Sequence, residues 1–444
     1  MIAIKLNSRY EKLLQIFLII VTYVMIILRF LLNEKGRMSP DSIRYLRQAN
    51  VFPIIDDTIA PLGYPLSIKF FTLFGVDEFW GSKLVGLFAY TFILIYAYRK
   101  KFYFKELLVV SSLFSFVSIF SFTMSEAFTL PFVILLFFTA HQIFKNRLTQ
   151  IQGIFFLTFL LILLLNIRYS ALFFCLGMLA FGVMNFRKSY WKTFAISGIL
   201  GIGFYGLYKL LFIDYFNENY IAQSLEIGLK PTSTLVPELF QGLATTFDPF
   251  VHMTDPNGGI INYGIYGIGV LTILAMVFLF IKTKLSETER FILSIFAVCI
   301  LCSYFIQYFY WINPMDYRLL APFSIGVWII FFRKLFQIFD DIVYSIAFLS
   351  LMTGFVFTWL SKGDYLENRE IISAFLEKEK LKDNTFEFYV QSLENLDEVQ
   401  VAELISTVNP KVYITFKATD TVKNNVLTRY KVESKIKIKK NNYQ

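Results

Sequence analysis

The chain has 444 residues, of which 56% are hydrophobic and only 17% are charged, and its mean hydropathy is +0.57. Soluble proteins carry charge on roughly a quarter of their positions, so this composition argues against a water-soluble fold and indicates an integral membrane protein. The net charge of +9 does not indicate a nucleic-acid partner, because the lysines and arginines form short clusters between apolar blocks.

The cysteines and histidines argue against two further kinds of site. Cys175, Cys299 and Cys302 all fall inside apolar blocks, so the sequence supports neither a disulfide framework nor a cysteine metal cluster. The chain has only two histidines, which excludes a histidine-rich metal site.

Apolar blocks recur over residues 1–360, and most are long enough to cross a hydrocarbon layer of about 30 Å as a helix. We expect about eleven membrane-spanning helices in this region. In chain order they cover 13–32, 80–98, 107–123, 127 to about 145, two halves of 151–186, 194–212, 260–281, 291–310, about 319–333 and 338–360. The pair within 151–186 turns at Arg168, because an arginine buried in hydrocarbon costs several kcal/mol.

Basic residues at the ends of the spans indicate their orientation. Three of them precede the first span, so the positive-inside rule places the N-terminus in the cytoplasm of a multi-pass cell or inner membrane protein. Every inner segment then carries a basic cluster, and two long loops, 33–79 and 213–259, lie on the outer face. The semi-apolar stretch 61–75 is too short for a span, and we expect it to form a helix at the outer interface.

The tail 361–444 changes to a polar composition and reads as a separate, small α/β domain on the outer, extracytoplasmic side. Its pattern predicts a helix at 369–381, a strand at 386–390, a helix at 397–408 and a strand at 412–416. Lysine and isoleucine alternate over 435–439, which predicts a final edge strand with its lysines in water.

A helix start in the first outer loop carries the first candidate for chemistry. Pro40 and Asp41 favour a helix beginning there, and Arg44 and Tyr45 follow Asp41 by three and four residues, so the three should share one helix face. A carboxylate beside a cation can accept a proton from a hydroxyl while the cation holds an anion. Asp41 could equally serve only to cap the helix.

Acids and arginines also gather at the later outer turns. Glu126 begins the fourth span, Arg168 and Tyr169 follow the fifth, and Asp316 and Arg318 precede the tenth. Arginine binds phosphate bidentately and is always charged, so arginines and acids at one membrane depth indicate a phosphate-bearing lipid substrate. Further outer-face acids are Asp56, Asp57, Asp248 and Asp255.

Five short motifs recur in a familiar order over about the first 330 residues: Pro40-Asp41-Ser42-Ile43-Arg44-Tyr45-Leu46, Pro61-Leu62-Gly63-Tyr64-Pro65, Ser125-Glu126-Ala127, Ile167-Arg168-Tyr169 and Tyr317-Arg318-Leu319-Leu320-Ala321-Pro322. In these motifs the chain resembles the GT-C superfamily of polytopic membrane glycosyltransferases. A first-loop acid is the catalytic carboxylate of that family, and Asp41 is the matching position. Ser42 and Ile43 follow it where the family often has a second acid, which leaves the need for a divalent metal open.

The resemblance implies transfer of a sugar from a polyprenyl-phosphate donor to a glycan, lipid or protein acceptor on the outer face, with inversion. Asp41 would be the general base, and Arg168, Arg318 and Arg44 would stabilise the departing phosphate. The remaining candidates for substrate binding are Tyr45, Tyr64, Glu126, Tyr169 and Asp316.

Two other functions fit a basic polytopic chain. A flippase or transporter of lipid-linked saccharides would place ionisable groups within its spans, whereas here nearly all charges fall at span ends. An envelope-polysaccharide polymerase would be expected to carry a late outer loop rich in arginine, and the loop 213–259 has none.

Overall fold

The computed structural model describes residues 7–32, 40–55, 60–218, 227–252, 254, 259–310, 312, 314–392, 395–418 and 426–439. It is 76% helix and 3% strand. The chain divides into two compact units. The first unit holds 1–25, 87–120 and 125–355, and the second holds 26–86, 121–124 and 356–444.

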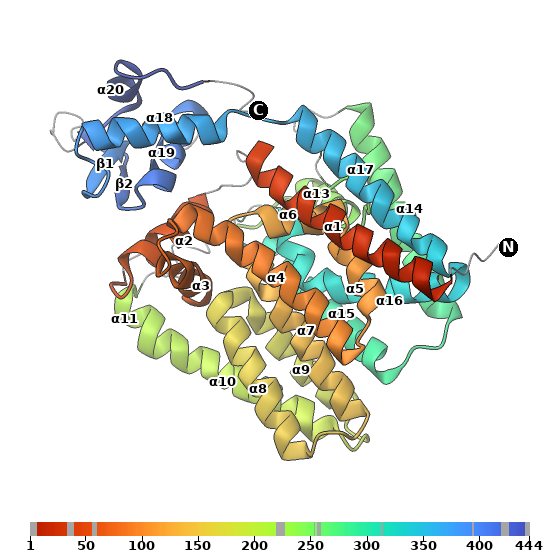
Figure 1. The fold of residues 1–444 in the computed structure, drawn as a ribbon. Coiled ribbons are helices and arrows are strands. Elements are labelled where there is room, and N and C mark those ends of the chain that lie inside the picture. Colours follow the sequence, from red (N-terminus) through yellow and green to blue (C-terminus); the bar gives the residue numbers. More distant parts are fainter. Residues whose placement is uncertain are drawn as a thin grey trace. The chain divides into compact units, whose positions relative to one another are not determined.

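Within the described residues, nine helices are long and apolar enough to cross a membrane (Figure 1). They are α1 (Ser8–Leu32), α4 (Glu78–Lys100), α7 (Ser125–Phe144), α8 (Gln150–Ile167), α10 (Trp191–Tyr208) with its continuation to Phe216, α14 (Ile260–Lys282), α15 (Glu287–Phe309), α16 (Tyr317–Phe339) and the segment Asp341–Leu360, which contains α17 (Tyr344–Leu360). Their length and composition fit the predicted class, a helical polytopic membrane protein.

Two of the predicted spans differ from the expected form. The third is two short helices, α5 (Phe104–Ser111) and α6 (Phe114–Ser121), bent by 73° at the break. The backbone N–H of Phe114 donates to the hydroxyl of Ser350 at 2.8 Å, and such a bond from a neighbouring helix is what allows a break at membrane depth. The sixth, Tyr169–Met184, contains α9 (Leu172–Met184) and is shorter than the other spans.

Helix α16 forms the centre of the first unit, packing against α15, α7 and α5. It carries an ionic cluster toward each end. Toward its C-terminal end, Glu289 lies 3.0 Å from Lys334 and 3.6 Å from Arg333. At its N-terminal end, Arg318 pairs with Glu126.

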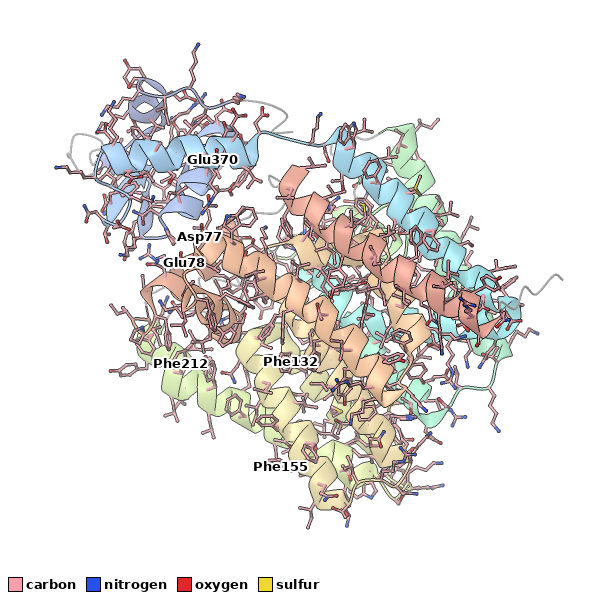
Figure 2. The ribbon with its side chains drawn as sticks, in the orientation of Figure 1. Asp77, Glu78, Phe132, Phe155, Phe212 and Glu370 are labelled. Carbon is pink, nitrogen blue, oxygen red and sulfur yellow. The ribbon has the colours of Figure 1, made fainter. Side chains whose placement is uncertain are left out.

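The outward faces of several first-unit helices are strongly apolar. Phe155 on α8 is 63% exposed (Figure 2), and Leu271 and Ile281 on α14 are exposed as well. Contiguous apolar surface of this kind is unfavourable in water and is what contact with lipid chains requires.

The predicted loop 213–259 contains a further helix, α13 (Thr232–Thr246), which packs against α14 and α16. Two glycines allow the backbones to approach. A Cβ on Gly242 would lie 2.1 Å from the carbonyl oxygen of Met315, and one on Gly269 would lie 2.0 Å from that of Ala244. This close packing joins α13 to the start of α16.

The second unit contains α2 (Pro40–Val51), α3 (Gly63–Thr72) and the polar tail. The tail consists of α18 (Tyr365–Lys378), β1 (Phe386–Tyr389), α19 (Leu396–Val408), β2 (Val412–Thr415), β3 (Val426–Leu427) and α20 (Arg429–Glu433). Its strands form a parallel sheet in the order β2-β1-β3, and α18 packs along α19 (Figure 1). The four helices and strands predicted between 369 and 416 are therefore present.

The predicted strand at 435–439 is wrong. This segment is not paired with the sheet, whose third strand is β3. The buried side chain of Asn368 instead donates to the carbonyl of Lys439 and accepts from its N–H, both at 2.8 Å. One amide side chain thus satisfies the backbone groups that a neighbouring strand would have satisfied.

The tail packs on the first predicted outer loop within the second unit. The guanidinium of Arg47 on α2 lies 3.4 Å from the ring centroid of Tyr413 on β2. Arg369 on α18 pairs at 2.8 Å with Asp77, which lies just before α4 (Figure 2). The sequence did not predict this association of 33–79 with the tail.

Candidate functional site

Three helix ends in the first unit bring together a buried carboxylate and two arginines. Glu126 lies in the first turn of α7, Arg168 is the C-cap residue of α8, and Arg318 is the second residue of α16. Glu126 Oε1 lies 3.0 Å from Arg168 Nη1 and 3.6 Å from Arg318 Nε. The sequence predicted these residues on one side of the membrane, and the structure places them in one cluster.

The Glu126 side chain is only 2% exposed, while the arginines are 14% and 21% exposed. A buried charge is tolerated only when it is paired, and the two arginines are the charged partners of Glu126. Neither carboxylate oxygen makes a hydrogen bond within the described residues, so these contacts are ion pairs without hydrogen-bond geometry. Asp316 interacts electrostatically with all three side chains, so the cluster contains two guanidinium groups and two carboxyl groups.

Asp316 connects this cluster to a cavity. It is the N-cap of α16, where its Oδ1 accepts the N–H of Leu319 at 2.9 Å. Burial raises its pKa, and the nearby Arg318 opposes that shift. Its side chain also lines a cavity of about 340 Å³ in the first unit.

The cavity is polar on several sides. It is lined by Asp316, Tyr317, His252, Glu238, Gln241 and Thr245, among others. The ring centroids of His252 and Tyr317 lie 4.0 Å apart. Glu238 Oε2 accepts a hydrogen bond from Lys230 and another from Gln307, each at 2.8 Å. Sequence reasoning missed this cavity; the one signal was Gln307, a polar residue inside an apolar block.

Four predicted site residues, Asp41, Arg44, Tyr45 and Tyr64, lie in the second unit. Asp41 and Arg44 form an exposed pair at 3.5 Å, with side chains 53% and 40% exposed. Tyr45 does not share their exposed surface: it is buried against Tyr64, with ring centroids 5.1 Å apart. All three residues lie on α2 at the expected helical spacing, but only the Asp41 and Arg44 side chains are accessible to a substrate.

The ring of Tyr169 lies near two tyrosine rings of α10. Its ring centroid lies 6.3 Å from that of Tyr205 and 6.4 Å from that of Tyr208. This places Tyr169 among aromatic side chains next to Arg168.

Asp248 is a further buried acid of the first unit, between α13 and α14. Its Oδ1 accepts the N–H groups of Phe250 and Val251 at 2.7 and 2.9 Å. Burial nevertheless raises its pKa to about 6. Three other acids of the predicted outer face, Asp56, Asp57 and Asp255, lie outside the described residues.

Among the residues that the structure describes, no group of three or more His, Cys, Asp or Glu side chains could hold a metal ion. No protein-family model, no curated protein and no solved structure matches the chain. Functional inference therefore depends on the chemistry of these residues.

Proposed function

We propose that the chain is a membrane glycosyltransferase of the GT-C type, which moves a sugar from a polyprenyl-phosphate donor to an acceptor at the outer face of the membrane. The observation that carries the proposal is the cluster of Arg168 and Arg318 around the buried Glu126. When the glycosidic bond to the carrier breaks, negative charge grows on the departing phosphate. Cations held in place before the reaction stabilise that charge most effectively.

Glu126 has a positioning role in this proposal. Its burial keeps it from direct contact with a substrate, whereas its carboxylate holds two guanidinium groups that would otherwise repel one another. Both arginine side chains remain partly exposed, and guanidinium geometry suits bidentate binding of a phosphate group.

The location of the cluster suits a lipid-linked donor. Glu126 begins α7, Arg168 ends α8 and Arg318 begins α16, so all three lie at the same end of antiparallel spans. The opposite ends of α7 and α16 carry Lys145, Arg333 and Lys334, which by the positive-inside rule face the cytoplasm. A carrier whose chain stays in the bilayer can reach such a site with its phosphate. In this orientation the tail 361–444 is extracytoplasmic.

Asp41 is the proposed general base, which accepts the proton of the acceptor hydroxyl as that oxygen attacks the anomeric carbon. A general base must come within about 3 Å of the proton-bearing oxygen, and the exposure of Asp41 makes it accessible to an acceptor. Arg44 keeps a positive charge beside it. Tyr45 and Tyr64 support α2 from its buried side. A single displacement of this kind inverts the anomeric configuration.

One observation favours a transporter of lipid-linked saccharides as the second candidate. Arg29 in the last turn of α1 and Lys83 in the second turn of α4 are buried although they lie near span ends, and buried ionisable groups often mark a transport pathway. Arg29 donates to Thr358 Oγ1 at 3.1 Å and Lys83 to Thr123 Oγ1 at 3.0 Å, which equally suits a structural role.

The two functions are separated by following the sugar and its carrier in the same vesicles. Purified protein in liposomes receives a panel of polyprenyl-phosphate sugars with a labelled sugar, together with candidate acceptors. Release of free polyprenyl phosphate with transfer of label supports the glycosyltransferase. Movement of the intact donor between leaflets, without cleavage, would contradict it and support transport.

A further inference from the structure

A second cavity, of about 750 Å³, lies in the first unit and is lined by several cations. Its walls come from the end of α4, the start of α5, the end of α7 and the later part of α16. The cations are Arg99, Lys101, Lys105, Lys145 and Arg333. Because Glu126 and Lys145 lie at opposite ends of α7, this cavity is separate from the arginine cluster and does not rest on the proposed function.

Two of these cations are already held by acids of the protein. Lys105 pairs with Glu11 and lies 3.7 Å from Asp341. Arg333 lies 3.6 Å from Glu289 and donates to the hydroxyl of Tyr103 at 2.7 Å.

The other three cations, Arg99, Lys101 and Lys145, form no ion pair within the described residues. The one acid that lines the cavity, Glu106, does not pair with them. The cavity therefore presents unbalanced positive charge.

Two residues at the edge of the cavity, Lys101 and Tyr103, have backbone conformations that are unfavourable for residues other than glycine. Helix α4 ends in a Schellman motif, in which Phe102 N–H bonds to Ala97 O at 3.0 Å and Lys101 N–H bonds to Tyr98 O at 3.2 Å. Lys101 occupies the left-handed position of this motif, with φ of 51°, where glycine is the unstrained choice. Tyr103, two residues on, also has a positive φ, of 50°. Strained backbone of this kind is typical of ligand-binding loops.

Aromatic side chains also lie at the edge of this cavity. Tyr98 is 67% exposed, and its ring lies 5.2 Å from that of Phe104. Exposed tyrosine beside basic residues at the end of a span is typical of the membrane–water interface. Basic cavities between helices on the cytoplasmic side are suited to anionic lipid head groups.

We propose that this cavity is a binding site for a phosphate group, carried either by an anionic lipid or by a small soluble phosphate. Arg99, Lys101 and Lys145 supply the unbalanced charge that recognises it. The site lies at the end of the bundle that its basic residues predict to be cytoplasmic.

The test uses the full chain in phosphatidylcholine nanodiscs, with fluorescent phosphatidic acid as the lipid probe and inorganic phosphate as the soluble one. Two variants each remove one charge: Lys101→Gly, which also relieves the strained backbone, and Lys145→Gln. Lys282→Gln, at the end of α14 and outside the cavity, is the matched control. Because Lys101→Gly removes strain, its unfolding temperature should equal or exceed that of the wild type, so any loss of binding is not a loss of folding.

Each cavity variant should weaken phosphatidic acid binding by about fivefold, the effect of one basic residue near an anionic surface, while Lys282→Gln leaves it unchanged. Competition by millimolar inorganic phosphate assigns the site to a soluble phosphate, and binding without such competition assigns it to the lipid. Equal binding by the wild type and both cavity variants, or no binding of either probe, overturns the proposal.

Discussion

Glu126 and Arg168 form an ion pair of 3.0 Å in which the carboxylate is only 2% exposed. The pair joins the start of one span to the end of the next, and Arg318 approaches the same carboxylate from a third helix. A single buried acid therefore fixes two cations that the proposed reaction needs.

Replacing Glu126 with Gln should destabilise the first unit, because the two guanidinium groups lose the charge that balances them. We expect a loss of about 2–3 kcal/mol, at the low end for a broken buried pair since both arginines are partly exposed. Unfolding temperature in detergent is the measurement. Glu287→Gln is the control: Glu287 is 36% exposed, and its loss should cost less than about 1 kcal/mol. Equal small effects in both variants would show that the cluster is not a structural unit.

Arg168→Ala and Arg318→Ala should weaken donor binding. Loss of one charge-assisted contact to the lipid phosphate should reduce affinity at least about tenfold, or ~1.4 kcal/mol. Titration with a polyprenyl-phosphate sugar measures it. Arg290→Ala removes an arginine that is 56% exposed and outside the cluster, and it should bind normally. Wild-type affinity in both cluster variants would remove the phosphate-binding role.

Asp41→Asn should abolish most sugar transfer, by roughly 10²–10⁴-fold, because a neutral amide cannot act as a general base. Expression and membrane insertion should stay normal, since the side chain is 53% exposed. Asp383→Asn, an exposed change in the tail, is the control. If Asp41 only stabilises the helix start, activity will persist and the cost will be limited to about 0.3–1 kcal/mol of stability.

Asp248→Asn should change how stability depends on pH. Burial raises the pKa of Asp248 to about 6, above its value of about 3.9 in an unfolded chain. The folded state therefore binds the proton more tightly, so the contribution of Asp248 favours folding below about pH 4 and is lost as pH rises to about 6.

The difference in unfolding temperature between the wild type and Asp248→Asn isolates this effect. An amide oxygen can still accept the N–H groups of Phe250 and Val251, so the variant should gain stability relative to the wild type between pH 4 and 6, by up to about 2 kcal/mol. A difference that is constant over this range would contradict the assignment.

Hydropathy predicted most of the long apolar helices, because each depends on its own apolar composition: within the described residues, nine of the eleven expected spans are single helices of sufficient length. Hydropathy could not predict the break between α5 and α6, because the side chain that stabilises it, Ser350, lies far along the chain. The lysine–isoleucine alternation at 435–439 led to the wrong prediction of a strand. The local pattern does not reveal that the side chain of Asn368 bonds to the backbone of Lys439 in place of a partner strand.

The candidate site was predicted in part for the same reason. Glu126, Arg168 and Arg318 could be grouped because topology alone places span ends on one side. His252 and Glu238 could not, because the cavity they line forms only when α13 packs against the start of α16. The association of the tail with α2 likewise depends on contacts such as Arg47 with Tyr413, which leave no local pattern.

The distance between the two ionic clusters of α16 can be compared with the thickness of a bilayer. Arg318 and Arg333 are fifteen residues apart, or about 22 Å along a helix, which is less than the ~30 Å hydrocarbon core of a typical bilayer. Arginine side chains extend from such positions toward the head groups, so in the proposed function a donor phosphate held by Arg318 would lie near the boundary of the hydrocarbon core. Bilayer thickness would then affect turnover, with thinner membranes easing donor entry and thicker ones hindering it.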